Sequence, residues 1–173
     1  LLLLNLKYYG IRSTMLSIAS RLAPSGTTRD KLALKSRFVG DRNFDHMYKV
    51  DTWESIPMSG LDFNDEQART AKQYQPTCPI NLHFGIEETR IAPSSFTFID
   101  LGCRKGRSLI VALESGFRKA IGVELSELLF EIALSNFKNL AARSKLDSHQ
   151  CEIVRCDAAS FVFPKDALFI IHD

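Results

Sequence analysis

The sequence predicts an α/β protein, built on a parallel β-sheet with helices on both faces and a helical N-terminal extension. From Ser94 onward, short apolar runs alternate with segments of helical periodicity, which is the pattern of strands joined by crossover helices. Residues 1–93 are instead polar and irregular, with breaks at Pro57, Pro76 and Pro79. With 173 residues, of which 45% are apolar, the chain can form one compact domain. We therefore expect a helical or irregular extension at 1–93 and a sheet domain at 94–173.

Four short apolar runs predict buried strands, at residues 96–101, 120–124, 151–156 and 167–171. The segment 107–115 predicts a helix that ends at Gly116 in the C′ position. Ser126 is a suitable N-cap for a longer helix. The apolar stripe of that helix comprises Leu129, Ile132, Ala133, Phe137 and Leu140.

Composition excludes several classes of protein. The net charge of +2, from 22 basic and 20 acidic residues, gives no strong field for binding nucleic acid. The longest apolar stretches, residues 1–4 and 109–113, are far shorter than the ~20 residues that span a bilayer. The four cysteines and four histidines lack zinc spacing, so we expect no metal site and four reduced thiols.

The first 29 residues contain four basic and no acidic residues. This composition suits a mitochondrial presequence, but apolar residues at three- and four-residue steps also fit an amphipathic helix, which we favour. We expect a cytoplasmic protein, with the mitochondrion as the alternative.

Acidic residues lie at the carboxyl ends of three predicted strands. Asp100 opens a turn that contains Gly102 and Gly106, and glycines there allow a tight turn and close approach of a ligand. Glu124 ends the second strand, where a carboxylate can accept the hydroxyls of a ribose, and Asp157 follows the third. Because ligands of open α/β sheets bind at the carboxyl ends of the strands, the three acids are predicted to face one crevice.

In these motifs the sequence resembles the class I S-adenosylmethionine-dependent methyltransferases, whose sheet is Rossmann-like. Their first motif runs D/E-x-G-x-G-x-G, which Asp100, Gly102 and Gly106 match, whereas Arg104 replaces the middle glycine. The segment that ends Ile121-Gly122-Val123-Glu124-Leu125-Ser126 looks like the small members related to protein-lysine methyltransferases. Tyr74-Gln75-Pro76-Thr77 is similar to a Tyr-x-Pro-Thr element of some members. The resemblance covers about residues 70–173.

The resemblance implies S-adenosylmethionine as cofactor and a methyl acceptor, such as a protein side chain, as partner. Asp173 would lie beside the transferring methyl group as a catalytic residue. The implied cofactor-binding residues are Asp100, Gly102, Cys103 and Gly106 around the methionine part, Glu124 and Leu125 at the ribose, Asp157 and Ala158 at the adenine, and Tyr74 as a cover.

Two departures from the family leave alternatives open. Arg104 could fill the place of the cofactor, strain the turn if its φ is positive, or swing into solvent. Only four of the family's seven strands are predicted, which suggests the N-terminal half of the domain, with an exposed edge at 167–171 that favours association. The alternatives to an active methyltransferase are an inactive binding module and, ranked last, an NAD-dependent oxidoreductase, whose G-x-G-x-x-G spacing is not met.

The segment before the sheet domain could supply a lid or an acceptor surface, in particular residues 44–45 and 50–53, which include the single tryptophan, Trp53. Lys105 and Arg107 are interpreted as residues at the start of a helix. A cation is unfavourable there unless it meets a negative partner.

Overall fold

A computed structural model describes residues 42–64, 75–143 and 148–169 of the chain. The chain divides into two compact units between Lys49 and Val50. In the first unit, residues 42–48 are helical, and the rings of Phe44 and Tyr48 pack with their centroids 4.6 Å apart. The sheet and all the features described below belong to the second unit, while the predicted domain boundary after residue 93 stays a prediction.

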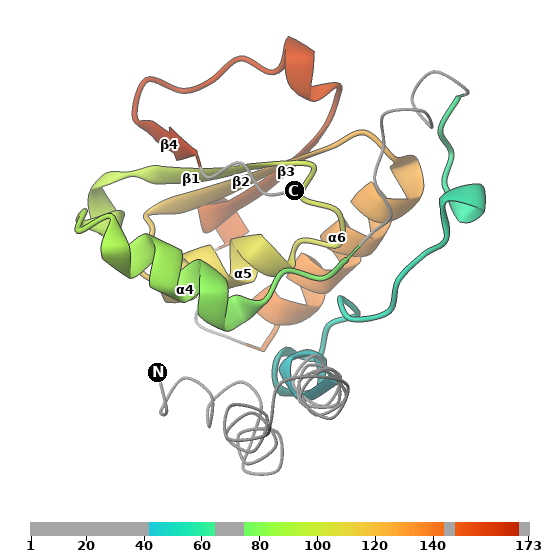
Figure 1. The fold of residues 1–173 in the computed structure, drawn as a ribbon, viewed down its shortest axis with the longest axis horizontal. Coiled ribbons are helices and arrows are strands. Elements are labelled where there is room, and N and C mark those ends of the chain that lie inside the picture. Colours follow the sequence, from blue (N-terminus) through green and yellow to red (C-terminus); the bar gives the residue numbers. More distant parts are fainter. Residues whose placement is uncertain (1–41, 65–74, 144–147, 170–173) are drawn as a thin grey trace, which may run out of the picture. The chain divides into compact units, whose positions relative to one another are not determined.

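Four parallel strands form one sheet in the order β3-β2-β1-β4 (Figure 1). Their bounds lie within two residues of the predicted ones: β1 (Thr97–Leu101), β2 (Lys119–Glu124), β3 (Cys151–Arg155) and β4 (Ala167–Phe169). The central strands β1 and β2 are buried along almost their whole length, which explains their continuous apolar sequence. The α/β fold with a parallel sheet is confirmed.

Three helices accompany the sheet: α4 (Pro79–Glu88), α5 (Arg107–Glu114) and α6 (Glu127–Ala141). The chain steps from β1 to β2 to β3 in one direction, so right-handed crossovers place α5 and α6 on the same face, and α4 packs against α5 (Figure 1). Helical cover of the other face stays a prediction. Within the described ranges, no helix has both the length and the apolar character to cross a membrane.

The core between α5 and the sheet holds the turn after β1 close to β2. Phe98 and Phe117 are buried with ring centroids 5.4 Å apart, edge to face. At Gly122, in the middle of β2, an added Cβ would lie 2.5 Å from Sγ of Cys103 and 2.6 Å from Cδ1 of Leu109. Only glycine therefore lets the turn and α5 pack this closely on β2.

The strands β3 and β4 form the two edges of the described sheet. On β3, Glu152 pairs with Lys119 and Arg155 with Glu127, and charged side chains of this kind discourage edge-to-edge pairing. Association through the edge at β4 stays a prediction.

Candidate functional site

The turn between β1 and α5 is built from three residues with positive φ. Gly102 has φ 79°, Arg104 has φ 56° and Gly106 has φ 83°. The backbone N–H groups of Gly102 and Cys103 both donate to the carbonyl of Val123, over 2.8 and 3.0 Å, which ties the turn to the end of β2. Gly106 is the N-cap of α5 and packs on α6, so an added Cβ would lie 3.0 Å from the Phe137 ring.

Glu124, the last residue of β2, is a buried acid held by backbone donors. Its Oε1 accepts from the N–H groups of Leu125 and Ser126, both over 2.9 Å, and its Oε2 accepts from the N–H of Arg104 over 2.7 Å. The side chain is 4% exposed. Burial raises the pKa of Glu124, and the three backbone donors together with the positive charge of Arg104 oppose that effect only in part. A carboxylate offers about four acceptor positions, so one position remains for a ligand hydroxyl.

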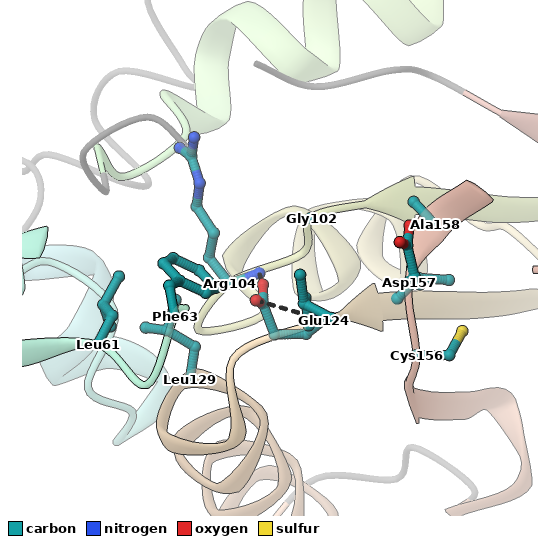
Figure 2. A pocket seen from close by; sticks show the side chains of 11 residues that line it. Leu61, Phe63, Gly102, Arg104, Glu124, Leu129, Cys156, Asp157 and Ala158 are labelled. Atoms are coloured by element: carbon teal, nitrogen blue, oxygen red, sulfur yellow. Dashed lines mark hydrogen bonds between the residues drawn. The ribbon is translucent and has the colours of Figure 1, made fainter. Parts of the chain in front are cut away.

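A pocket of about 220 Å³ opens at the carboxyl ends of β1, β2 and β3 (Figure 2). Arg104, Val123, Leu129 and Cys156 contribute to its wall together with Leu61 and Phe63 from the segment before the sheet. Five residues predicted at the cofactor also line it: Gly102, Glu124, Leu125, Asp157 and Ala158.

Three other predicted residues belong to β1 or to the turn itself and are not among those that line this pocket. Asp100 is 2% exposed and accepts a hydrogen bond from the Ser108 hydroxyl at the start of α5. Cys103 is buried, and Gly106 packs against α6. These contacts give the three residues a role in shaping the turn. Tyr74 and Asp173 lie outside the described residues.

Asp157 stands at the far side of the pocket from Leu61 in Figure 2. It is the N-cap of the short 3-10 turn Ala158–Ser160, and its Oδ1 accepts from the N–H of Ala159 over 2.9 Å. The cap fixes the direction of the chain after β3 and keeps Ala158 at the pocket wall.

The side chain of Arg104 rises from the turn, away from the Glu124 carboxylate (Figure 2). Its Nη1 donates to the carbonyl of Gln75 over 3.1 Å. The sequence predicts strain in the turn if Arg104 has a positive φ. That φ is positive, at 56°. Arg104 thus lines the pocket as a residue, while its guanidinium is held by the chain that precedes α4.

The segment Leu61, Asp62 and Phe63 was missed by sequence reasoning. Leu61 and Phe63 line the pocket, while Asp62 caps α6 from a distant part of the chain: its Oδ2 accepts from the N–H of Glu127 over 2.8 Å. Burial tends to raise the pKa of Asp62, but hydrogen bonds from the Ser126 hydroxyl and the first N–H groups of α6 outweigh it and lower that pKa. A distant cap leaves no local sequence pattern.

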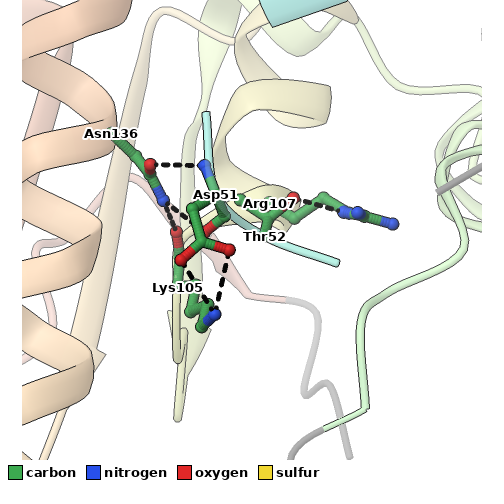
Figure 3. Close-up of polar contacts among 5 residues, drawn as sticks. All are labelled: Asp51, Thr52, Lys105, Arg107 and Asn136. Atoms are coloured by element: carbon green, nitrogen blue, oxygen red, sulfur yellow. Dashed lines mark hydrogen bonds and ion pairs between the residues drawn. The ribbon is translucent and has the colours of Figure 1, made fainter. Parts of the chain in front are cut away.

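Lys105 and Arg107, interpreted from sequence as helix-start residues, both find partners in the segment 51–52 (Figure 3). Lys105 Nζ contacts both carboxylate oxygens of Asp51, over 3.1 and 3.2 Å, and Arg107 Nε donates to the Thr52 hydroxyl over 2.7 Å. Both basic side chains are 2% exposed. Asn136 of α6 completes the cluster. The segment therefore fixes the turn beneath the pocket, and whether residues 50–53 also receive an acceptor stays a prediction.

Comparison with known proteins gives structural but no sequence-level matches. No family model matches the chain, and no curated protein matches it. Among solved structures, a protein-L-isoaspartate O-methyltransferase superposes with a TM-score of 0.50 at 16% identity, over 72% of this chain and 38% of that one.

Two further structures superpose less well, and no argument rests on them. One is a protein of Pyrococcus horikoshii described as an RNA methyltransferase, with a TM-score of 0.45 and 12% identity over 93% of this chain and 57% of that one. The other is the mitomycin 7-O-methyltransferase MmcR, with a TM-score of 0.38 and 13% identity over 94% and 40%. The chain thus spans from 38% to 57% of the length of these structures.

The chain shares the Rossmann-like α/β fold of that protein-L-isoaspartate O-methyltransferase, which is the fold that the sequence motifs predicted. At 16% identity the superposition establishes the fold alone.

Proposed function

We propose that this chain binds S-adenosylmethionine in the pocket at the ends of β1, β2 and β3 and serves S-adenosylmethionine-dependent methyl transfer. The observation that carries the proposal is the position of Glu124. Its buried carboxylate lies at the pocket that Gly102 and Asp157 also line. A carboxylate at the end of the second strand of an open α/β sheet is suited to a ribose.

The residues present fit such a cofactor. Glu124 keeps one acceptor position for a ribose hydroxyl, and the space beyond Gly102 is open, since an added Cβ there would meet no atom within 4 Å. Apolar side chains of Leu125 and Ala158 border the same pocket. The volume of about 220 Å³ is below the ~300 Å³ of a complete ligand site, so it suits the nucleoside part of a ligand.

In this proposal Glu124 orients the ribose, Leu125 and Ala158 enclose the adenine, and the backbone turn around Gly102 leaves room for the methionine part. The bound cofactor would supply an activated methyl group on its sulfonium. The chain's own contribution is to position that group, and correct positioning of reactants is worth an effective concentration on the order of 10⁵ M or more. Catalytic participation of Asp173 remains part of the proposal.

We propose a protein side chain as the methyl acceptor, which rests on the sequence resemblance to the small protein-lysine-methyltransferase-like members. A lysine acceptor must lose its proton before it attacks the methyl group, because only the neutral amine has a free electron pair. Incubation with tritiated S-adenosylmethionine and a mixture of proteins or nucleic acids would show which class of acceptor is labelled.

Isothermal titration of the chain with S-adenosylhomocysteine tests the binding proposal directly. Glu124→Gln is expected to weaken binding about tenfold or more, because it replaces a hydrogen bond to a charged acceptor. Glu131→Gln, on the exposed face of α6, is the matched control and should bind as the unchanged chain does.

Two outcomes would overturn the proposal. One is the absence of heat with S-adenosylhomocysteine at high micromolar protein while the thermal melt shows a folded chain. The other is binding of NAD in place of S-adenosylhomocysteine, which would favour an oxidoreductase.

A further inference from the structure

The segment Leu61–Asp62–Phe63 lies beside the pocket although it precedes the sheet by more than thirty residues of sequence. Leu61 has φ −97° and ψ 151°, so the chain is extended there. In extended chain, alternate side chains point to the same side. Leu61 and Phe63 accordingly both reach the pocket, while Asp62 points to the first turn of α6.

Asp62 is held at the start of α6 by several donors. Its Oδ1 accepts from the Ser126 hydroxyl over 2.5 Å and from the N–H of Leu128 over 3.5 Å, and its Oδ2 accepts from the N–H of Glu127 over 2.8 Å. A carboxylate at a helix N-terminus is also favoured by the helix dipole. Asp62 is therefore fixed relative to α6, and its two neighbours are fixed with it.

Ser126 links this anchor to the acid at the pocket. Its N–H donates to Oε1 of Glu124 over 2.9 Å, while its hydroxyl donates to Asp62. One residue thus sets the position of Glu124 relative to the segment that carries Leu61 and Phe63. The hydrogen bonds of Ser126 therefore fix the wall made by Leu61 and Phe63 relative to the Glu124 carboxylate, which is the polar group that a ligand would meet.

We propose that Phe63, with Leu61, forms an apolar wall against which the nucleoside of the bound ligand packs, and that Asp62 is the residue that positions this wall. The inference rests on the proposed function and names residues for it that the sequence motifs do not contain. A nucleoside combines a flat apolar face with hydroxyl donors. The pocket offers the matching pair, an aromatic ring and aliphatic side chains beside the Glu124 carboxylate.

Titration of Phe63→Ala with two probes tests the contact. S-adenosylhomocysteine and 5′-methylthioadenosine share the nucleoside, but only the first carries the amino-acid part. Loss of a ring that packs on the nucleoside is expected to weaken both ligands by about tenfold or more and by the same factor. Phe84→Ala removes an exposed phenylalanine from α4, which does not line the pocket, and should change neither affinity.

The positioning role of Asp62 is tested by a double-mutant cycle. Asp62→Ala alone should weaken both ligands, whereas in the Phe63→Ala background it should add little, because the ring that it positions is already absent. A merely structural role would instead give losses that add. Amide hydrogen exchange supplies a readout without ligand: the N–H groups of Glu127 and Leu128 should exchange faster in Asp62→Ala than in the unchanged chain.

The possible failures differ from one another. If the unchanged chain binds S-adenosylhomocysteine and Phe63→Ala binds both probes equally well, the wall is overturned while the proposed function stands. If Phe63→Ala weakens S-adenosylhomocysteine alone, the ring serves the amino-acid part and the nucleoside contact is overturned. If the unchanged chain binds neither probe, the proposed function and the inference both fall.

Discussion

The backbone N–H of Arg104 donates to Oε2 of Glu124 over 2.7 Å, which joins the turn after β1 to the acid at the end of β2. The contact requires the backbone of residue 104 and not its side chain. Arg104 adopts the left-handed conformation there, at φ 56°. An arginine in place of the family's middle glycine therefore keeps the hydrogen bond but adds a Cβ where glycine would be less strained.

Arg104→Gly is expected to raise the free energy of unfolding by about 1 kcal/mol, because glycine adopts positive φ without steric cost. Arg90→Gly, at φ 54° after α4, should stabilise by a similar amount and is the matched control. Urea denaturation measures the free energy of unfolding of both variants.

The guanidinium of Arg104 points away from Glu124, so the affinity of Arg104→Gly for S-adenosylhomocysteine should stay within about threefold of the unchanged chain, or about 0.7 kcal/mol. A gain of tenfold in Arg104→Gly but not in Arg90→Gly would show that the arginine obstructs the pocket.

Asn136 connects α6 to the two segments that frame the turn. Its Oδ1 accepts from the N–H of Asp51 over 2.8 Å, and its Nδ2 donates to the carbonyls of Asp51 and Lys105 over 2.9 and 3.0 Å. Asn136→Ala leaves these groups without that partner and should lower the free energy of unfolding by about 2 kcal/mol. Asn139→Ala, on the exposed face of the same helix, should change it by less than about 0.5 kcal/mol. Equal effects of the two substitutions in chemical denaturation would contradict the role given to Asn136.

The sheet and part of the pocket could be predicted because their signals are local. Buried parallel strands leave continuous apolar runs, and Ser126 caps α6 as predicted, its hydroxyl accepting from the N–H of Leu129 over 3.3 Å. Residues at or just beyond the carboxyl ends of parallel strands, such as Glu124 and Asp157, necessarily come to the same edge of the sheet.

The remaining features depend on contacts between distant segments. Ser126 and Asp62 are 64 positions apart, and Lys105 and Asp51 are 54 apart. No periodicity in the sequence joins such pairs, so the apolar wall and the partners of the buried cations required the folded structure. For Asp100 the position in β1 was predicted, but the environment of its side chain was not. Its carboxylate accepts a hydrogen bond from Ser108, and the residue does not line the pocket.

The four cysteines are free thiols, and they are expected to differ in reactivity. Burial raises the pKa of Cys103 well above its ordinary value, as do the charges of Asp100 and Glu124, and burial raises the pKa of Cys151 to about 12. Both should resist iodoacetamide at pH 8, because the thiolate is the nucleophile. Cys156 is half-buried at the pocket and should react, as should the half-buried Cys78.

S-adenosylhomocysteine should then protect Cys156 and leave Cys78, outside the pocket, as the internal control. Peptide mass spectrometry after alkylation measures each site. Equal protection of the two thiols would point to a general tightening of the chain, and protection of neither would place the ligand elsewhere.

The buried Glu124 should make the free energy of unfolding depend on pH, and its burial sets the sign of that dependence. Because burial raises its pKa above the ordinary value of 4.5, the folded chain holds a proton over a pH range in which the unfolded chain has lost it. The contribution of Glu124 to the free energy of unfolding should therefore fall as the pH rises from that value through the raised pKa, by at most about 1.4 kcal/mol per pH unit. Glu124→Gln should lack this component, whereas Glu131→Gln should keep it, in urea melts between pH 4 and 8.

Ligand affinity should change in the opposite direction, because a ribose hydroxyl donates to the ionised acid. Binding of S-adenosylhomocysteine should therefore strengthen as the pH rises through the same range. Identical pH profiles for the unchanged chain and Glu124→Gln would contradict both expectations.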